Sequence, residues 1–215
     1  MIQAPANFGK LNRAEPFYYG ESPVTVIYAE TNLPTVHGTF RLRTYRFSKT
    51  VEPLAMISGY IDRKLPVAIR IHSSCLTSEV LGSCKCDCKQ QLDASLAYIQ
   101  EHSGVVIYLQ QEGRGIGLGD KVRVYALQEH GYDTIEANEM LGLPIDARQY
   151  DDAVSILRDL GISRVNLLTN NPKKISALVE AGIEVVERTA ISTVIDPQAE
   201  SYMETKKVRM GHLLE

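Results

Sequence analysis

The sequence of 215 residues lacks several features that would define its class at once. It has no run of 18 apolar residues, the length that a membrane-spanning helix requires. Its first ten residues, MIQAPANFGK, lack the apolar core of a signal peptide. The formal net charge is only -3, so there is no overall positive field of the kind that non-specific nucleic-acid binding uses. We therefore expect a cytoplasmic protein that binds neither membranes nor nucleic acids.

Cysteine is also scarce, and all four cysteines lie in one stretch, SCLTSEVLGSCKCDC at residues 74–88. Structural disulfides are rare in the cytoplasm, so such a cluster points first to a metal site or to redox chemistry. Free, partly buried thiols are the alternative. Three thiolates would leave a zinc ion one position for water, as in catalytic sites, whereas four would close it. The spacing alone leaves this choice open.

The geometry of the cluster restricts how one ion could be bound. In an extended strand, Cys84, Cys86 and Cys88 would share a face, with the outer two about 13 Å apart. Ligands of a single tetrahedral zinc ion lie only about 4 Å from one another. All three can converge only if the segment curls, and two of them with Cys75 make an easier pocket.

Strand and helix patterns alternate along most of the chain. This alternation predicts an α/β layered domain with much parallel pairing at residues 31–215, preceded by an N-terminal extension at residues 1–30. The expected strands are 33–47 (a strand or hairpin), 65–73, 105–109, 165–169 and 183–187, and the expected helices are 89–102, 121–130, 149–160 and 173–181.

The glycine-rich stretch EGRGIGLGD (112–120) follows a predicted strand but matches neither the dinucleotide fingerprint nor the Walker pattern. It is either a phosphate-binding turn that carries Glu112 and Arg114 or an ordinary tight turn.

Three further positions have two readings each. Lys173 and Lys174 begin a predicted helix, where cations are unfavourable, so they indicate a bound anion or a solvated helix face. His72 is a metal ligand or a hydrogen-bonded histidine at a strand end. Asp146, in DARQY (146–150), is by itself no more than a possible helix N-cap.

Several segments together resemble the GTP cyclohydrolase II family, which opens the riboflavin pathway. The resemblance covers Leu33 to Leu214 and is carried by RIHSSCLTSEVLGSCKCDC, QQEGRGIGLGDK, GYDTIEAN, DARQY, LLTNNPKK and YMETKKVRMGHLL. It implies a homodimeric enzyme with a layered α/β/α domain, a mixed sheet, one Zn²⁺ per chain and Mg²⁺. The implied reaction converts GTP to 2,5-diamino-6-(5-phosphoribosylamino)pyrimidin-4(3H)-one, formate and pyrophosphate.

The resemblance also implies residue roles. The zinc ligands would be Cys75, Cys86 and Cys88. The proton acceptor would be Asp146, the nucleophile Arg148, and a catalytic tyrosine Tyr125. The nucleotide-binding positions would be Arg70, Ile71, His72, Ser73, Ser74, Gln91, Glu112, Gly113, Arg114, Thr134, Thr169 and Lys174.

These residue types suit the implied chemistry. Opening the imidazole ring requires water to add at C8, and zinc with an open position lowers the pKa of bound water to about 7. Tyr125 could assist proton transfer, and Arg114, Arg148 and Lys174 are candidates to surround the phosphates. Because a guanidinium stays protonated, we favour charge stabilisation for Arg148, with Asp146 activating water.

The sequence departs from the family pattern close to this chemistry. Ser74 replaces an acid, Lys89 brings a positive charge beside the metal in place of glycine, GLGDK replaces GLLNK, and Ala147 and Gln149 replace two acids. Four alternatives therefore stand: a paralogue that stops at a formamidopyrimidine, one that uses another purine nucleotide, a non-catalytic nucleotide-binding or metal-sensing protein, and a redox protein. Cys84 is expected to be a bystander with a small buried side chain.

Overall fold

The computed structural model describes residues 27–47 and 51–191. In this part of the chain, seven strands form one sheet in the order β1-β2-β3-β5-β4-β6-β7. Most of the predicted N-terminal extension and the segment YMETKKVRMGHLL lie outside the described residues. The strands are β1 (Ile27–Thr35), β2 (Gly38–Tyr45), β3 (Leu54–Ser58), β4 (Val67–Ser73), β5 (Gly104–Leu109), β6 (Arg164–Leu168) and β7 (Glu184–Thr189).

The sheet is mixed, as the resemblance implied. β1, β2, β3 and β5 pair in antiparallel fashion, whereas β5, β4, β6 and β7 pair in parallel. The expected hairpin at 33–47 is confirmed as β1 and β2, although β1 already begins at Ile27, inside the predicted extension.

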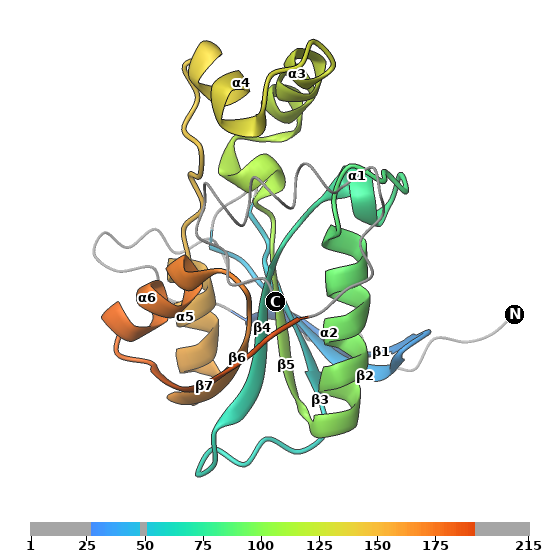
Figure 1. Ribbon diagram of the computed structural model, residues 1–215. Helices are drawn as coiled ribbons and strands as arrows, with labels where there is room; N and C mark the ends of the chain where they lie inside the picture. Colours follow the sequence, from blue (N-terminus) through green and yellow to red (C-terminus); the bar gives the residue numbers. More distant parts are fainter. Residues whose placement is uncertain (1–26, 48–50, 192–215) are drawn as a thin grey trace, which may run out of the picture.

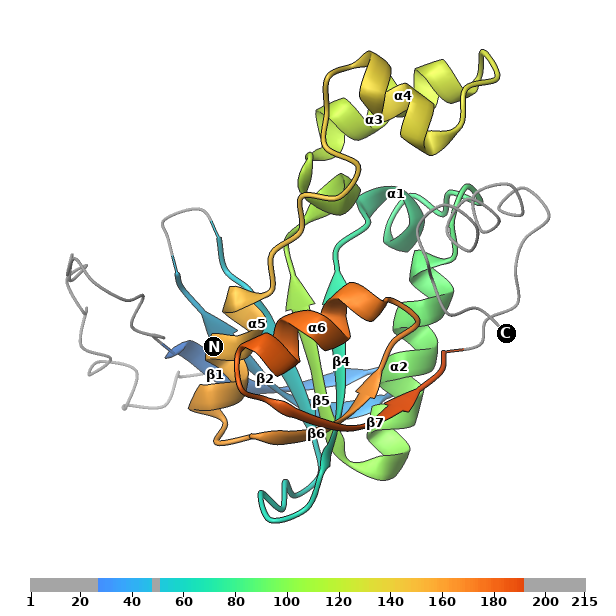
Figure 2. The same ribbon diagram turned by 60° about the vertical axis from the view of Figure 1, so that its left-hand side comes forward.

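The helices cover both faces of the sheet. Figures 1 and 2 show α2 against one face and α5 and α6 against the other, so the α/β/α layering is confirmed. α3 and α4 project beyond one end of the sheet, and we call residues 118–140 the α3–α4 arm. The helices are α1 (Leu76–Glu79), α2 (Cys88–His102), the 3-10 helix η2 (Glu112–Gly115), α3 (Leu118–Gln128), α4 (Thr134–Met140), α5 (Asp151–Asp159) and α6 (Pro172–Glu180).

Alternation along the central strands produces two hydrophobic clusters, one on each face. On β4, Ile69 and Ile71 join the larger cluster beneath α5 and α6. On β5, Val106 points to the other face, where it packs with Leu96 and Ile99 of α2. Arg70 and His72 also occupy this second face, because they alternate with the isoleucines, and both are buried. The pleat of β4 therefore carries two polar side chains toward the α2 side.

Three elements were not anticipated from the sequence pattern: α1, β3 and α4. β3 has only five residues, and α4 has seven. α4 nevertheless has a sequence signal: Asp133 accepts from the amides of Ile135 and Glu136, while the Glu136 side chain accepts from the amide of Asp133. This capping box starts the helix. Among the described helices, none has both the length and the apolar character needed to cross a bilayer.

Candidate active site

A pocket lies where the carboxyl ends of β5, β4 and β6 meet. These three strands are neighbours and run in parallel, so the loops that follow them converge at one edge of the sheet. Ser73 at the end of β4, Gln111 after β5 and Thr169 after β6 all line it. The α3–α4 arm contributes the opposite wall, with Tyr125 and Thr134.

Three of the four cysteines border this pocket as one cluster. The ligand atoms of Cys75, Cys86 and Cys88 all lie within 4.8 Å of one another, and the Sγ atoms of Cys75 and Cys86 are 3.7 Å apart. This agrees with the spacing of about 4 Å between thiolates that share a tetrahedral ion. The expected curl is confirmed: residues 84 and 85 form a turn, and α2 then begins at Cys88.

The donor set fits a metal ion with an open position. Cys75 and Cys86 are each 4% exposed, and within the described residues the cluster holds no fourth histidine, cysteine or carboxylate ligand. Hydrogen bonds from the thiols of Cys86 and Cys88 lower the pKa of Cys75, against the effect of burial, and Thr77 and Lys121 act in the same direction. Cys75 is thus favoured as the thiolate, the form that binds metals, whereas its hydrogen bond with Cys86 raises the pKa of Cys86.

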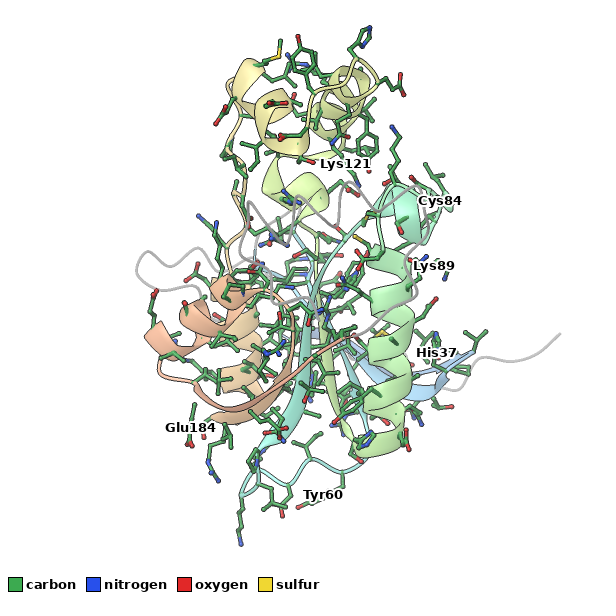
Figure 3. All side chains as sticks on the ribbon, in the orientation of Figure 1. His37, Tyr60, Cys84, Lys89, Lys121 and Glu184 are labelled. Atoms are coloured by element: carbon green, nitrogen blue, oxygen red, sulfur yellow. The ribbon has the colours of Figure 1, made fainter. Side chains whose placement is uncertain are left out.

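Lys121 supplies a cation beside this thiolate. Its Nζ lies 3.1 Å from Cys75 Sγ, 2.8 Å from Thr77 Oγ1 and 2.7 Å from Glu112 Oε1. Burial opposes the charge, but Glu112 and Cys75 outweigh it and raise the pKa of Lys121. Figure 3 places Lys121 at the foot of the arm, so its ion pair with Glu112 joins the arm to η2, and its bonds to Cys75 and Thr77 join the arm to the segment that carries Cys75.

Cys84 lies apart from the cluster, as expected, but the expectation that it is buried was wrong. Its side chain is exposed because it stands in the turn before α2, and Figure 3 shows it at the outer side of the α1 region. None of the four cysteines forms a disulfide.

A second feature of the pocket is a group of three cations, Arg70, Arg148 and Lys174. Arg70 and Lys174 are each 4% exposed, and Lys174 donates from Nζ to the carbonyl of Ile71 at 2.7 Å. Burial lowers the pKa of Lys174 well below its usual value, and repulsion from Arg70 and Arg148 acts in the same direction. Burial also lowers the pKa of Arg70 to about 10, so its guanidinium remains charged at neutral pH.

This arrangement decides between the two readings of the lysine pair. Lys174 is buried in the pocket wall, so the solvated-face reading was wrong for it. Lys173 is exposed and lies 3.8 Å from Asp146 Oδ2. An anion in the pocket would offset the repulsion among Lys174, Arg70 and Arg148, so the bound-anion interpretation stays a prediction for Lys174.

Asp146 and Arg148 form a two-pronged ion pair. Arg148 Nε lies 2.9 Å from Asp146 Oδ1, and its NH2 group lies 2.8 Å from Oδ2. Burial raises the pKa of Asp146, but Arg148 and Lys173 outweigh that effect and lower it overall. Asp146 is not a helix N-cap, because α5 is capped at Tyr150.

The glycine-rich turn holds this ion pair in place. Gly113 and Arg114 adopt left-handed backbone conformations in η2, and the Arg114 carbonyl accepts from the amide of Ala147 at 3.0 Å. A Cβ on Gly115 would lie 2.9 Å from the Ala147 carbonyl carbon. The turn is therefore a packed support for residues 146–148, and its own Glu112, Gly113 and Arg114 line the pocket.

Most residues singled out from the sequence converge on this pocket. Asp146 and Ile71 are not part of the lining: Asp146 reaches it through Arg148, and the Ile71 side chain is in the larger hydrophobic cluster. The lining residues among those predicted are Arg70, His72, Ser73, Ser74, Cys75, Cys86, Cys88, Gln91, Glu112, Gly113, Arg114, Tyr125, Thr134, Arg148, Thr169 and Lys174.

His72 proves to be the hydrogen-bonded histidine and not a metal ligand. Its Nε2 lies 2.9 Å from Glu79 Oε1, and its Nδ1 lies 3.4 Å from the Arg70 NH2 group. Burial lowers the pKa of His72 to about 4; Arg70 adds to this effect and Glu79 opposes it. His72 is therefore neutral at pH 7.

Sequence reasoning missed Lys121 and Glu79. Both are polar residues on short helical segments with buried side chains. Lys121 is the last residue of QQEGRGIGLGDK and lies in the first turn of α3. Because this helix begins in a polar, glycine-rich turn, the sequence pattern did not predict that the Lys121 side chain is buried. Glu79 lies four residues after Cys75, which is the spacing that lets its carboxylate reach the Cys75 amide across one helical turn.

Three departures from the family pattern lie away from the pocket. Lys89 pairs with Asp93 at 3.0 Å on the exposed side of α2, so the expected positive charge beside the metal was wrong (Figure 3). Ala147 and Gln149 are exposed and do not line the pocket. Ser74 does line it.

The fold and the site together define an α/β protein with a cysteine cluster beside a cationic pocket. A family model described as GTP cyclohydrolase II matches residues 26–190. This chain belongs to the GTP cyclohydrolase II family.

Curated relatives agree with that assignment. The chain is 49% identical to the riboflavin biosynthesis protein RibBA of Bacillus cereus over 86% of its length, and 46% identical to RibBA of Chlamydia trachomatis over 92%. It covers 47% of each relative, so it spans about half the length of these proteins. A solved RibBX structure from A. baumannii, a two-domain 3,4-dihydroxy-2-butanone 4-phosphate synthase, matches with a TM-score of 0.44 at 20% identity, covering 80% of this chain and 41% of that chain.

Proposed function

We propose that this chain is a zinc-dependent hydrolase of riboflavin biosynthesis that opens the imidazole ring of GTP at C8. The products are formate, pyrophosphate and 2,5-diamino-6-(5-phosphoribosylamino)pyrimidin-4(3H)-one. Family membership and the RibBA relatives support this proposal.

One observation carries the proposal: the three-cysteine cluster and three cationic side chains, two of them buried, border the same pocket. The cations match a polyphosphate, because guanidinium and ammonium groups donate strongly to phosphate oxygens. The thiolate cluster lies close to them, because Cys88 interacts electrostatically with both Arg70 and Lys174. A polyanionic substrate with a hydrolysable group fits a pocket that has both features.

Cys75, Cys86 and Cys88 would hold the zinc ion. When bound with an open position, zinc supplies hydroxide for attack at neutral pH. Within the described residues, the ligand group ends at three thiols, which favours the open site over a closed structural one.

Arg148 is assigned to charge stabilisation. Its guanidinium is paired with Asp146 through two hydrogen bonds and stays protonated, which makes it a poor nucleophile. Asp146 orients this guanidinium and is the candidate proton acceptor once the pair opens around substrate. Tyr125 faces the pocket from the arm and is the candidate for proton transfer during ring opening.

Mg²⁺ is proposed to accompany the triphosphate, because release of pyrophosphate requires its charge to be balanced. A homodimer in solution is proposed from the family. Sedimentation or light scattering would measure the dimer mass, and a monomer that is active at all concentrations would contradict it.

Product analysis tests the proposed reaction. Purified protein with GTP and Mg²⁺ should release formate and pyrophosphate in equal amounts and form the diaminopyrimidine, as measured by mass spectrometry. A product that keeps its formyl group would identify a paralogue that stops at a formamidopyrimidine. Zinc and GTP binding without turnover would identify a nucleotide-binding homologue.

The second candidate function is that of a paralogue that stops at a formamidopyrimidine. Ser74 favours it most, because of the positions Ser74, Lys89, Ala147 and Gln149, where the chain departs from the family pattern, only Ser74 lines the pocket. Ser74→Glu restores the family's acid. If the wild-type reaction stops early and the variant proceeds further, Ser74 limits the reaction.

A further inference from the structure

Glu79 is a buried carboxylate that receives three hydrogen bonds. Its Oε1 accepts from the Cys75 amide at 2.8 Å and from His72 Nε2 at 2.9 Å, and its Oε2 accepts from the Tyr108 hydroxyl at 2.7 Å. The Glu79 side chain is 9% exposed and the His72 side chain 3%. The Glu79 carboxylate, at the end of α1, therefore connects three segments: the loop that carries Cys75, strand β4 through His72, and strand β5 through Tyr108.

The donors around His72 fix its tautomer. The Arg70 NH2 group, 3.4 Å from His72 Nδ1, can only donate, so Nδ1 must accept. The single proton of the neutral ring is then on Nε2, which donates to Glu79. Arg70 is held further by donating to Gln91 Oε1 at 2.8 Å and to the Leu168 carbonyl at 3.1 Å.

A continuous chain of hydrogen bonds therefore connects Cys75 to Arg70 in the pocket. It passes from the Cys75 amide through Glu79 and His72 to Arg70. Cys75, His72 and Arg70 all line the pocket, whereas Glu79 stands behind them and does not. Every contact of Glu79 on this path is one in which a carboxylate oxygen accepts.

We propose that Glu79 is a positioning residue that holds Cys75 and Arg70 in a fixed relation through the Cys75 amide and His72. The inference rests on the proposed function in treating the thiols as zinc ligands and Arg70 as a phosphate-binding group. Removal of the carboxylate frees the loop that presents Cys75 and allows His72 to turn away from Arg70. Both metal affinity and polyphosphate affinity then fall together.

Two substitutions of Glu79 separate the loss of its hydrogen-bond acceptors from a change in the size of its side chain. Glu79→Met keeps the length of the side chain but removes both acceptors. Glu79→Gln keeps one oxygen for Cys75 and His72, while its NH2 group can donate to Tyr108, whose hydroxyl can rotate to accept. Tyr108→Phe removes only the third donor. Glu184→Met, on an exposed ion pair with Arg164, is the matched control.

The experiment measures zinc affinity by chelator competition and inorganic triphosphate affinity by calorimetry, on proteins whose cooperative unfolding shows that they are folded. Glu79→Met should weaken zinc binding about 10- to 100-fold, the range found for groups that orient metal ligands, and should weaken triphosphate binding as well. Glu79→Gln, Tyr108→Phe and the control should stay within about threefold of wild type.

A folded Glu79→Met protein with unchanged affinities for both probes would overturn the inference. If that variant does not fold, the wild-type protein gives an independent answer, because ¹⁵N chemical shifts of the His72 ring report its tautomer. A proton on Nε2 is expected, and a proton on Nδ1 would overturn the inference. Neither measurement uses GTP turnover, so failure of the proposed reaction would be seen separately.

Discussion

At the scale of single residues, burial divides the four cysteines into two kinds. Cys75 and Cys86 are buried at the pocket, Cys88 begins α2 beside them, and Cys84 points outward from a turn. Sequence spacing could place two cysteines near Cys75 but could not say which, because the choice depends on where the turn ends and the helix begins.

The cysteine assignment predicts opposite outcomes for two substitutions. Cys86→Ala should lose zinc and activity, because two thiolates cannot retain the ion at an open site. Cys84→Ala should keep both. Elemental analysis of the purified proteins measures zinc per chain. A Cys84→Ala protein without zinc would contradict the assignment.

His72 gives a prediction about pH. Its pKa is about 4 in the folded protein, against 6.5 for an ordinary histidine. Between these values the unfolded chain binds a proton that the folded protein does not, so stability falls as the pH drops from about 6.5 to about 4. The slope from this residue is at most about 1.4 kcal/mol per pH unit.

Urea unfolding at several pH values tests this contribution. The His72→Gln variant keeps a donor for Glu79 and an acceptor for Arg70 but has no ionisable ring. Its stability should depend less steeply on pH than that of wild type in this window. Equal slopes for the two proteins would show that His72 does not titrate as described.

At the scale of elements, the glycine-rich turn joins the pocket wall to the Asp146–Arg148 pair. Gly115 and Gly117 both have a φ of +89°, but only Gly115 faces another backbone, that of Ala147 and Arg148. Gly115 ends η2 and Gly117 is the N-cap of α3, and the two also differ in the space that a Cβ would enter.

Substituting alanine at each of these glycines should separate the cost of backbone strain from the cost of a steric clash between the new Cβ and the backbone of Ala147 and Arg148. Gly117→Ala strains a backbone with φ +89° and ψ 168°, a region essentially confined to glycine, and costs about 1–3 kcal/mol. Gly115→Ala adds a clash with Ala147 and Arg148 of roughly 1–3 kcal/mol and displaces Arg148, so turnover should fall as well as stability. Denaturant unfolding and the turnover rate measure the two effects. Equal losses of turnover in both variants would contradict this support role.

The elements recovered from sequence were those with long periodic patterns. α2 and α5 show apolar residues at helical spacing, and β5 is a continuous buried run, so all three were predicted. β3 was missed because its sequence, LAMIS, has a single β-branched residue and no alternation of polar and apolar side chains. α4 was missed although Asp133 and Glu136 carry a capping signal, because the helix lies outside the packed core and has few buried apolar residues.

At the scale of the whole molecule, the cysteine cluster of Cys75, Cys86 and Cys88 is separate from the two hydrophobic clusters. None of its three cysteines belongs to either hydrophobic cluster. The sheet and its covering helices should therefore fold without metal, unlike zinc fingers, whose fold depends on the ion.

Removal of zinc by a chelator should abolish activity and lower the midpoint of thermal unfolding, but leave one cooperative transition. Circular dichroism follows the secondary structure, and added zinc should restore turnover. Loss of the secondary structure on chelation would show that the cluster is structural.

The sequence predicted parallel strands but not their order, so it did not show that the segments after β4, β5 and β6 share one edge of the sheet. It could not show that Lys174 is buried or that Lys89 turns outward. Those outcomes depend on which helix face packs against the sheet.

The pocket cations have a consequence for directed evolution. Arg70, Arg148 and Lys174 repel one another in the folded protein, so an apolar side chain at position 174 would relieve this repulsion while removing a group that we propose binds the substrate. Selection for heat resistance alone would therefore enrich inactive variants at this position. Selection in the presence of triphosphate would retain the lysine.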